Sequence, residues 1–205
     1  MSKIKALIFD FGDVFINLDK TGAMKNALKL FKLNVLEPDM IATNTLYEVG
    51  EISTEAFLDF YISKFPNLNT SNITDAWNYI IKDFPEHRLE FIKQLSKEDN
   101  YKLILLSNTN EMHINYIKSN VSFYEEFKNC FDAFYLSHEI HLRKPNLGIY
   151  NFVLQDNNLA ANSCLFVDDT KENTNAAKEL GIHTWNIDET KEDVVDLFKI
   201  KSDLF

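Results

Sequence analysis

The chain has 205 residues, of which 45% are hydrophobic and 25% are charged, and its formal net charge at pH 7 is −10. This length and composition are typical of a globular protein with one substantial core, or with a core and an inserted unit. The negative charge argues against nucleic acid as a partner, because an acidic surface repels phosphate backbones. A small phosphorylated ligand is compatible with this charge, since a local metal ion and a lysine can outweigh the distant field.

The N-terminal segment has basic residues followed by an apolar run that Asp10 interrupts. This run is too short for the core of a signal peptide, and no stretch of the sequence approaches a transmembrane span. We therefore expect a cytoplasmic protein without membrane contact, and we take a monomer as the default. Cys130 and Cys164 lie among apolar residues, which predicts reduced, buried thiols rather than a disulfide or zinc ligands.

The first predicted element is a short apolar strand at residues 5–9, which ends in an acidic loop with Asp10 and Asp13. Residues 18–84 then carry helical signals and no strand signal. Ser53 is expected to cap one helix, which places Phe57, Phe60, Tyr61 and Phe65 close to one face. Another helix is expected over residues 75–84, with Trp77, Ile80 and Ile81 turned inward. Pro85 marks the return to the main domain.

From residue 85 onward, predicted strands and helices alternate. Strands are expected at residues 101–106, 133–136, 164–167 and 183–187. Helices are expected at residues 88–95, 111–119, 147–155 and 171–180, the last one closed by Gly181. This alternation predicts an α/β fold with a parallel sheet and right-handed crossovers. Residues 1–17 and 85–205 would form that core, and residues 18–84 an all-helical cap over the carboxyl edge of the sheet.

Carboxylates follow two of the predicted strands, at opposite ends of the chain. Asp10 ends the first strand, and Asp168 and Asp169 end the strand at residues 164–167. Parallel strands would bring these carboxylates together in the crevice where such sheets bind ligands. Two adjacent carboxylates repel each other unless a cation compensates, and Mg²⁺ prefers such oxygen ligands. The Thr170 hydroxyl and the Asn173 amide are near enough in sequence to orient the pair.

Two further segments could contact a phosphoryl group. Ser107 and Asn108 end another strand, where they could donate hydrogen bonds to phosphoryl oxygens, cap the next helix, or do both. Lys144 precedes Pro145, which restricts the local backbone. Such a lysine could neutralise a nucleophilic aspartate and a phosphate together, or it could be an ordinary surface lysine.

In order and context, these segments resemble the four motifs of the haloacid dehalogenase-like hydrolase superfamily. The match is close to its subgroup with a small helical cap after the first motif, and it covers essentially the whole chain. The motifs are Phe9-Asp10-Phe11-Gly12-Asp13-Val14, Leu105-Leu106-Ser107-Asn108-Thr109-Asn110, Arg143-Lys144-Pro145 and Phe166-Val167-Asp168-Asp169. Tyr135-Leu136-Ser137, together with the Ser-Asn-Thr-Asn run, looks particularly like the alpha-D-glucose-1-phosphate phosphatase-like branch.

The resemblance implies a Rossmann-like core and a phosphatase that hydrolyses a small phosphorylated metabolite, such as a sugar phosphate. By that resemblance, Asp10 attacks phosphorus and forms an aspartyl-phosphate. Mg²⁺ would be held by Asp10, the main-chain carbonyl of Gly12, and Asp169, with Asp168 close to the metal or one water away. Ser107 and Asn108 would hold phosphoryl oxygens, and Lys144 would bridge the nucleophile and the phosphate.

One position departs from the family pattern. The usual motif has a second aspartate two residues after the nucleophile, which acts as general acid and base. Here that residue is Gly12, and the extra acid is Asp13, one residue later. Because loss of general acid catalysis costs about 10²- to 10⁴-fold in rate, we expect a slow phosphatase, one that favours good leaving groups, or one that recruits Asp13 or water.

Two rival functions are compatible with parts of this pattern. A metal-independent 2-haloacid dehalogenase would use Asp10 on carbon, but it would have no use for the Asp168-Asp169 pair. A catalytically weakened scaffold that binds a phosphorylated ligand would explain Gly12, but it need not keep a nucleophile. The residues expected to set specificity show no substrate pattern; they are Asn17, Asp19, Tyr47, Glu48 and Glu51.

Overall fold

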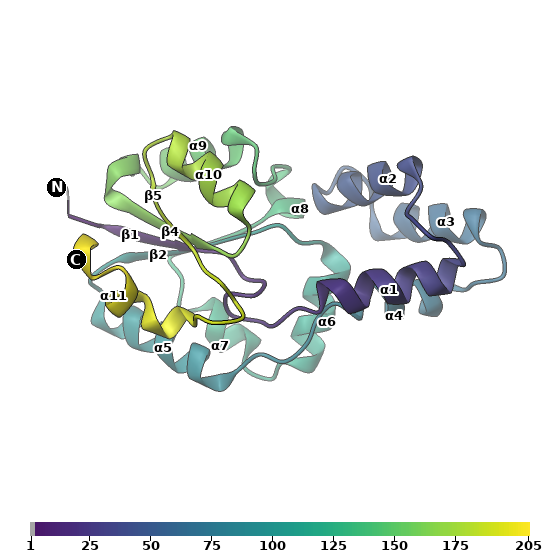
Figure 1. Cartoon of the computed structure of the whole chain (residues 1–205), viewed down its shortest axis with the longest axis horizontal. Coiled ribbons are helices and arrows are strands. Elements are labelled where there is room, and N and C mark those ends of the chain that lie inside the picture. The colour runs from purple at the N-terminus through teal and green to yellow at the C-terminus, as the bar shows by residue number, and fades with distance from the viewer. Residues whose placement is uncertain (1–2) are drawn as a thin grey trace.

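The computed structural model describes residues 3–205 of the chain. Within this range, five parallel strands form one sheet in the order β3-β2-β1-β4-β5. Their bounds are Ala6–Phe9 (β1), Lys102–Ser107 (β2), Ala133–Leu136 (β3), Cys164–Asp168 (β4) and His183–Asn186 (β5). Strand β1 lies between β2 and β4, so the polar residues that follow these three strands meet at one edge of the sheet (Figure 1). The predicted α/β fold with a parallel sheet is confirmed.

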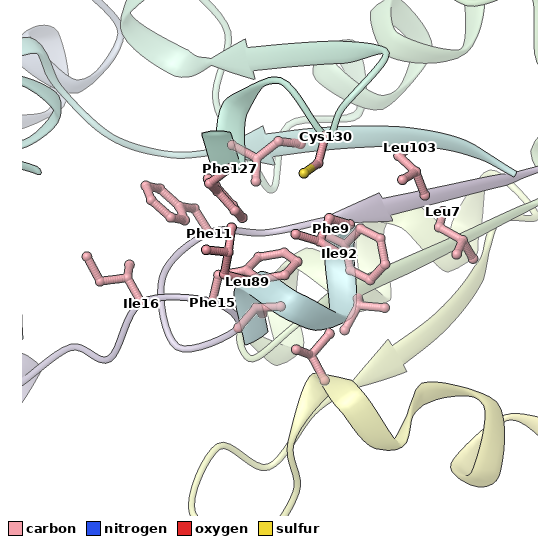
Figure 2. Close-up of a cluster of buried hydrophobic side chains, with 14 of the residues drawn as sticks. Leu7, Phe9, Phe11, Phe15, Ile16, Leu89, Ile92, Leu103, Phe127 and Cys130 are labelled. Carbon is pink, nitrogen blue, oxygen red and sulfur yellow. The ribbon is translucent and has the colours of Figure 1, made fainter. Parts of the chain in front are cut away.

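Each face of the sheet is covered by its own hydrophobic cluster. Because side chains alternate along a strand, Leu7 and Phe9 of β1 face one cluster, in which Figure 2 shows Phe127 and its neighbours. Ala6 and Ile8 face the other cluster. Both faces are therefore dry, which explains why these strands are nearly continuous apolar runs without polar alternation.

Helices pack on both sides of the sheet (Figure 1). One side carries α5 (Glu86–Glu98), α6 (Glu111–Asn120), α7 (Tyr124–Lys128) and α11 (Leu197–Ile200). The other side carries α9 (Leu147–Asp156) and α10 (Lys171–Glu179), while the short α8 (Ser137–Ile140) directly follows β3. No helix in residues 3–205 is long and apolar enough to cross a membrane.

A separate helical unit lies beyond the carboxyl edge of the sheet (Figure 1). It consists of α1 (Lys20–Phe31), α2 (Pro38–Glu48), α3 (Thr54–Lys64) and α4 (Thr70–Asn78). The unit has its own aromatic-rich cluster, in which Phe57 and Tyr61 of α3 are fully buried and Phe31 stacks on Phe65 at 4.5 Å between ring centroids. Offset aromatic contacts of this kind add about 0.5–1.5 kcal/mol each beyond the area that they bury.

The chain enters and leaves the helical unit through two segments that run side by side. Leu18 and Ile81 form an antiparallel bridge, the Asn17 amide donates to the Asp83 carbonyl at 2.9 Å, and the Lys82 amide donates to the Asn17 carbonyl at 2.9 Å. The buried Arg88 at the start of α5 donates to the Asn17 side chain at 2.9 Å. These bonds tie the two segments to each other and to the core.

Most predicted elements form within a residue or two of their expected bounds. Ser53 caps α3 by accepting a hydrogen bond from the Ala56 amide, and Gly181 follows α10 with φ of +85°, as predicted. The helix expected over residues 75–84 was wrong in its bounds, because α4 begins at Thr70 behind an Asn69–Asn72 capping box and ends at Asn78. The residues after α4 belong instead to the segment that returns to the core.

Candidate active site

The carboxylates at the carboxyl edge of the sheet form one cluster. Asp10 follows β1, Asp168 is the last residue of β4, and Asp169 comes next in the chain. One carboxylate oxygen from each lies within 4.8 Å of the others. The pairing of Phe9 with Val167 in adjacent parallel strands sets this proximity. An all-oxygen set of this kind fits a hard divalent cation such as Mg²⁺.

Lys144 lies directly behind the cluster and is saturated with acceptors. Its Nζ is 2.8 Å from Asp10 Oδ1, 2.6 Å from Asp168 Oδ2 and 2.8 Å from the Leu106 carbonyl oxygen, and its side chain is fully buried. Burial alone would lower the pKa of Lys144, but the two carboxylates outweigh burial and hold that pKa above its usual range. Each of the three ammonium protons thus has a partner, and the lysine fixes the carboxylates in place.

The two carboxylates that contact Lys144 have different surroundings. Burial raises the pKa of Asp10 to about 7, against the opposing effect of the Lys144 ammonium. Asp168 is held by protein donors on both oxygens, since the Asn173 amide is 3.0 Å from each oxygen and the Thr170 backbone amide is 2.8 Å from Oδ1. Both oxygens of Asp168 are thus engaged by protein donors, which makes this carboxylate an anchor for Lys144.

Ser107 and Asn108 do not cap the helix that follows them. Asn110 is the cap of α6, and its side chain accepts a hydrogen bond from the His113 amide at 3.0 Å. The Asn108 side chain instead makes two hydrogen bonds with the backbone of Lys144, each of 2.9 Å. Ser107 is buried at the end of β2. Asn108 thus positions the lysine segment, which the sequence did not suggest.

Leu18 fills the space that a side chain at residue 12 would take in the loop after Asp10. A Cβ added to Gly12 would lie 2.6 Å from Leu18 Cδ1. Asp13 turns away with φ of +56°, a left-handed conformation that aspartate tolerates better than most residues. Its carboxylate accepts from the Leu18 amide at 2.8 Å and pairs with Lys20 at 2.9 Å. Asp13 is thus engaged in holding the loop.

Two cavities share Lys20 in their linings, and one of them lies at the carboxylate cluster. The carboxylate chamber has a volume of about 370 Å³, and its lining includes Asp10, Gly12, Leu18, Lys144 and Asp169. The side chamber has a volume of about 400 Å³ and lies between the helical unit and α6. It is lined by apolar residues of α1 and α4 and by a few polar ones, which are Lys20, Asn44, Glu48, Asn110 and His113.

Lys20, the first residue of α1, has carboxylates on both sides. Its Nζ is 2.5 Å from Asp169 Oδ2 and 2.9 Å from Asp13 Oδ2, while 49% of its side chain remains exposed. Burial opposes the charged form, but the hydrogen bonds with Asp169 and Asp13 outweigh it and raise the pKa of Lys20. The helical unit thereby contributes a cation to the carboxylate edge of the sheet.

Polar contacts join the end of α2 to the core. Arg143 Nε is 2.7 Å from Glu48 Oε1, and the His141 ring donates to the Val49 carbonyl at 2.9 Å. Gly50 has φ of +70°, and a Cβ on it would lie 2.1 Å from the His138 carbonyl oxygen. Only glycine allows so close an approach of the two backbones.

His113 links the two parts of the molecule on the other side of the side chamber. Its Nε2–H donates to the Trp77 carbonyl of α4 at 3.1 Å, and its Nδ1 accepts from the side-chain amide Nδ2 of Asn110 at 3.2 Å. This arrangement requires the neutral ring. Burial lowers the pKa of His113 to about 4, so the ring is uncharged at neutral pH.

The residues expected to set specificity lie in different places. Glu48 lines the side chamber, Asn17 belongs to the paired segments at its base, and Asp19 caps α1. The Tyr47 hydroxyl is 2.8 Å from Thr54 Oγ1 and accepts from the Met112 amide, and Glu51 is exposed. Sequence reasoning missed Leu18, Lys20, Asn44 and His113, since a single leucine, lysine, asparagine or histidine in a helical region carries no signal of its own.

Comparisons with known proteins agree on one family. A family model for haloacid dehalogenase-like hydrolases matches residues 7–187. The chain is 29% identical over 192 residues to D-ribitol-5-phosphate phosphatase of Bacteroides thetaiotaomicron, a match that covers 89% of this chain and 91% of that protein.

Solved structures of a haloacid dehalogenase (HAD) family enzyme from the same bacterium are also similar. Its magnesium complex has a TM-score of 0.85 at 31% identity and covers 97% of this chain and 100% of that chain. Its complex with magnesium and inorganic phosphate has a TM-score of 0.82 at 30% identity and covers 95% and 99%. The narrower resemblance to glucose-1-phosphate phosphatases stays a prediction. The chain belongs to the haloacid dehalogenase-like hydrolase family.

Proposed function

We propose that the protein is a Mg²⁺-dependent phosphatase that hydrolyses a small phosphorylated sugar or sugar alcohol through an aspartyl-phosphate on Asp10. The observation that carries this proposal is the cluster of Asp10, Asp168 and Asp169 with Lys144 fixed behind it. A named phosphatase among the relatives, and HAD-family neighbours that bind magnesium and inorganic phosphate, support the same reaction.

The donor set fits Mg²⁺, because all of its ligand atoms are oxygens. Asp10, Asp169 and the Gly12 carbonyl would hold the ion, and Asp168 would lie behind them with its oxygens already bonded to protein donors. When bound, Mg²⁺ would neutralise charge on the phosphoryl group and on the carboxylates. The excess of carboxylates over cations at this edge of the sheet is itself an argument for a divalent ion.

The chain's own residues would perform the first step as follows. Asp10 Oδ attacks phosphorus, the bond from phosphorus to the ester oxygen breaks, and the electron pair of that bond stays on the leaving alkoxide. Lys144 keeps the attacking carboxylate ionised and oriented, which its contacts with Asp10 and Asp168 allow. Ser107 is expected to donate to a phosphoryl oxygen, and Asn108 would act mainly through the Lys144 backbone to which it is bonded.

The alkoxide takes a proton from water, and the resulting hydroxide attacks the phosphorus of the aspartyl-phosphate. The products are the alcohol, inorganic phosphate and the Asp10 carboxylate, so atoms and charges balance. No acid at residue 12 takes part, and Asp13 is engaged with Leu18 and Lys20. We therefore expect slow turnover of substrates that have poor leaving groups.

The side chamber supports a small polyhydroxylated leaving group. Its volume of about 400 Å³ suits a sugar alcohol, and Asn44, Glu48 and Asn110 offer hydrogen-bond partners for hydroxyl groups. A polyol phosphate would then extend from the carboxylate chamber under the helical unit, which would act as the cap. The relative that acts on D-ribitol 5-phosphate makes a pentitol phosphate the first substrate to test.

The test is release of inorganic phosphate from ribitol 5-phosphate, glucose 1-phosphate and p-nitrophenyl phosphate, with Mg²⁺ and with EDTA. We expect Mg²⁺-dependent release that Asp10→Asn abolishes and that Asp59→Asn, at an exposed position of α3, leaves unchanged. Acid quenching followed by mass spectrometry should find phosphate on the peptide that contains Asp10. Release that persists in EDTA or in Asp10→Asn would refute the proposal.

The same panel, extended by a 2-haloacid and by a binding measurement with inorganic phosphate, separates the two rival functions. A metal-independent dehalogenase would release halide from a 2-haloacid in EDTA and would release no phosphate. A scaffold would bind inorganic phosphate without turnover on any member of the panel. The close grouping of three carboxylates favours the phosphatase over the dehalogenase.

A further inference from the structure

Lys20 occupies the junction between the two chambers. Among residues 3–205, it alone lines both the carboxylate chamber and the side chamber. A phosphate ester whose phosphoryl group lies at Asp10 and whose alcohol lies in the side chamber must pass this junction. In such a pose, the bridging ester oxygen or an atom next to it would lie beside Lys20.

The other two cations of the carboxylate chamber line that chamber alone, and Lys144 is fully committed to other partners. All three protons of Lys144 are directed to Asp10, Asp168 and the Leu106 carbonyl, and its side chain has no exposure. Arg143 is paired with Glu48 of the helical unit. Lys20 directs its ammonium to Asp169 and Asp13. Because an ammonium has three protons, one of them remains available for a substrate. Lys20 also keeps half of its side chain exposed and thus has room to adjust.

The charge that develops on the ester oxygen needs a stabilising group in this site. Leu18 closes the place beside Gly12 where the family's usual acid would stand, so that wall of the chamber is apolar. An alkoxide is a poor leaving group unless a proton or a positive charge compensates it. An ammonium held at the junction supplies the positive charge without a proton transfer.

We propose that Lys20 contacts the ester oxygen of the bound substrate and stabilises the negative charge that this oxygen gains as its bond to phosphorus breaks. This proposal rests on the proposed phosphatase function. In the step described above, the electron pair of the broken bond stays on the alkoxide beside the Lys20 ammonium, and water then protonates the alkoxide. Asp13 and Asp169 are the positioning residues, because their carboxylates hold the lysine at the junction.

The test compares Lys20→Met and Lys20→Arg with the wild type on a series of phosphate monoesters whose leaving groups differ in pKa. Loss of one preorganised donor typically costs about 10²- to 10³-fold in rate. We expect a loss of that size for Lys20→Met on ribitol 5-phosphate, and about tenfold or less on p-nitrophenyl phosphate, whose leaving group needs little help. The dependence of kcat/KM on leaving-group pKa should therefore become steeper. Lys20→Arg should recover part of the rate, and Lys25→Met, at an exposed position of the same helix, should match the wild type.

A second measurement separates this role from support of the metal site. Titration calorimetry with Mg²⁺ alone should give Lys20→Met an affinity at least equal to that of the wild type, since removal of a cation from Asp169 leaves that carboxylate to the metal. Weaker Mg²⁺ binding, or an equal loss of rate for every leaving group, would overturn the proposal. If the wild type itself releases no phosphate, the proposed function fails, and that outcome is distinct from an active wild type with an unchanged leaving-group dependence.

Discussion

The carboxylate edge of the sheet and the helical unit above it are held in contrasting ways. At the sheet edge, Lys144 joins Asp10 and Asp168 through short contacts with no exposure of its side chain. The helical unit meets the core through two paired backbone segments, through Met112 of α6, which is buried in the cluster of the unit, and through partly exposed polar pairs such as Glu48 with Arg143. The carboxylate cluster is thus held by a fully buried ionic network at the sheet, whereas the side chamber lies mostly between helices of the separate unit.

The largest effect is expected from breaking the buried network. Lys144→Met would leave Asp10 and Asp168 buried without a counter-charge, which typically costs about 3–5 kcal/mol. Urea unfolding should detect this loss in free energy of unfolding. The matched change in the helical unit is Lys64→Met, whose ion pairs with Glu37 and Asp39 involve carboxylates that are about half exposed, and we expect a much smaller loss there. Equal losses in the two variants would contradict the contrast between the regions.

A pH effect should come from His113 at the contact between α4 and α6. Its pKa is about 4 in the folded protein and 6.5 in its ordinary state, so the unfolded chain binds more protons between these values. The contribution of His113 to stability is therefore complete above pH 6.5 and is lost as the pH drops toward 4, by about 3 kcal/mol at most, while the raised pKa of Asp10 acts in the opposite direction. His113→Gln should remove most of this dependence between pH 6.5 and 4. A dependence unchanged in His113→Gln would assign it to other groups.

An acidic side chain can be introduced at residue 12, beside the apolar Leu18. In Gly12→Asp alone, the new side chain would meet Leu18 Cδ1, so we pair it with Leu18→Ala to make room. The double variant should hydrolyse ribitol 5-phosphate faster than Leu18→Ala alone by about 10²-fold, the lower end of the range for general acid catalysis. Its advantage should shrink on p-nitrophenyl phosphate. No gain over Leu18→Ala would show that an acid at residue 12 does not reach the ester oxygen.

The smallest effect concerns the contact between α2 and the core. A double-mutant cycle of Glu48→Gln and Arg143→Gln should give a coupling energy of about 0.5 kcal/mol in urea unfolding, because both side chains are partly exposed. We expect KM for ribitol 5-phosphate to change more than kcat, since Glu48 and Arg143 line the chambers but, within residues 3–205, neither contacts Asp10 through a hydrogen bond or ion pair. A coupling energy above about 2 kcal/mol would instead place this contact among the rigid parts of the molecule.

The fold was accessible from the sequence because its strands are buried on both faces. Continuous apolar runs such as residues 103–106 and 164–167 are typical of parallel strands between helices, and the structure has strands at both. The bounds of α4 were not accessible, because Ile80 and Ile81 extend its apolar pattern into the returning segment. What ends the helix is the pairing of Ile81 with Leu18, more than sixty positions away in the sequence.

Some residues of the site could likewise be predicted from the sequence, and others could not. The meeting of Asp10 with Asp168 and Asp169 follows from two parallel strands that are neighbours, and simple chain topology predicts it. The positions of Leu18 and Lys20 depend on how the chain leaves the loop at Asp13 and begins α1 against the core. That geometry arises from long-range packing of the helical unit, so no local pattern of residues could have indicated it.

The side chamber also contains a natural optical probe. The sequence has two tryptophans, and Trp77 lines this chamber while Trp185 is buried in β5 at the far edge of the sheet. In a Trp185→Phe variant, all indole emission would come from Trp77. Entry of a polyol phosphate, or a shift of the helical unit, would then change the intensity and wavelength of the fluorescence. The chain therefore allows ligand binding to be followed in real time without an added label.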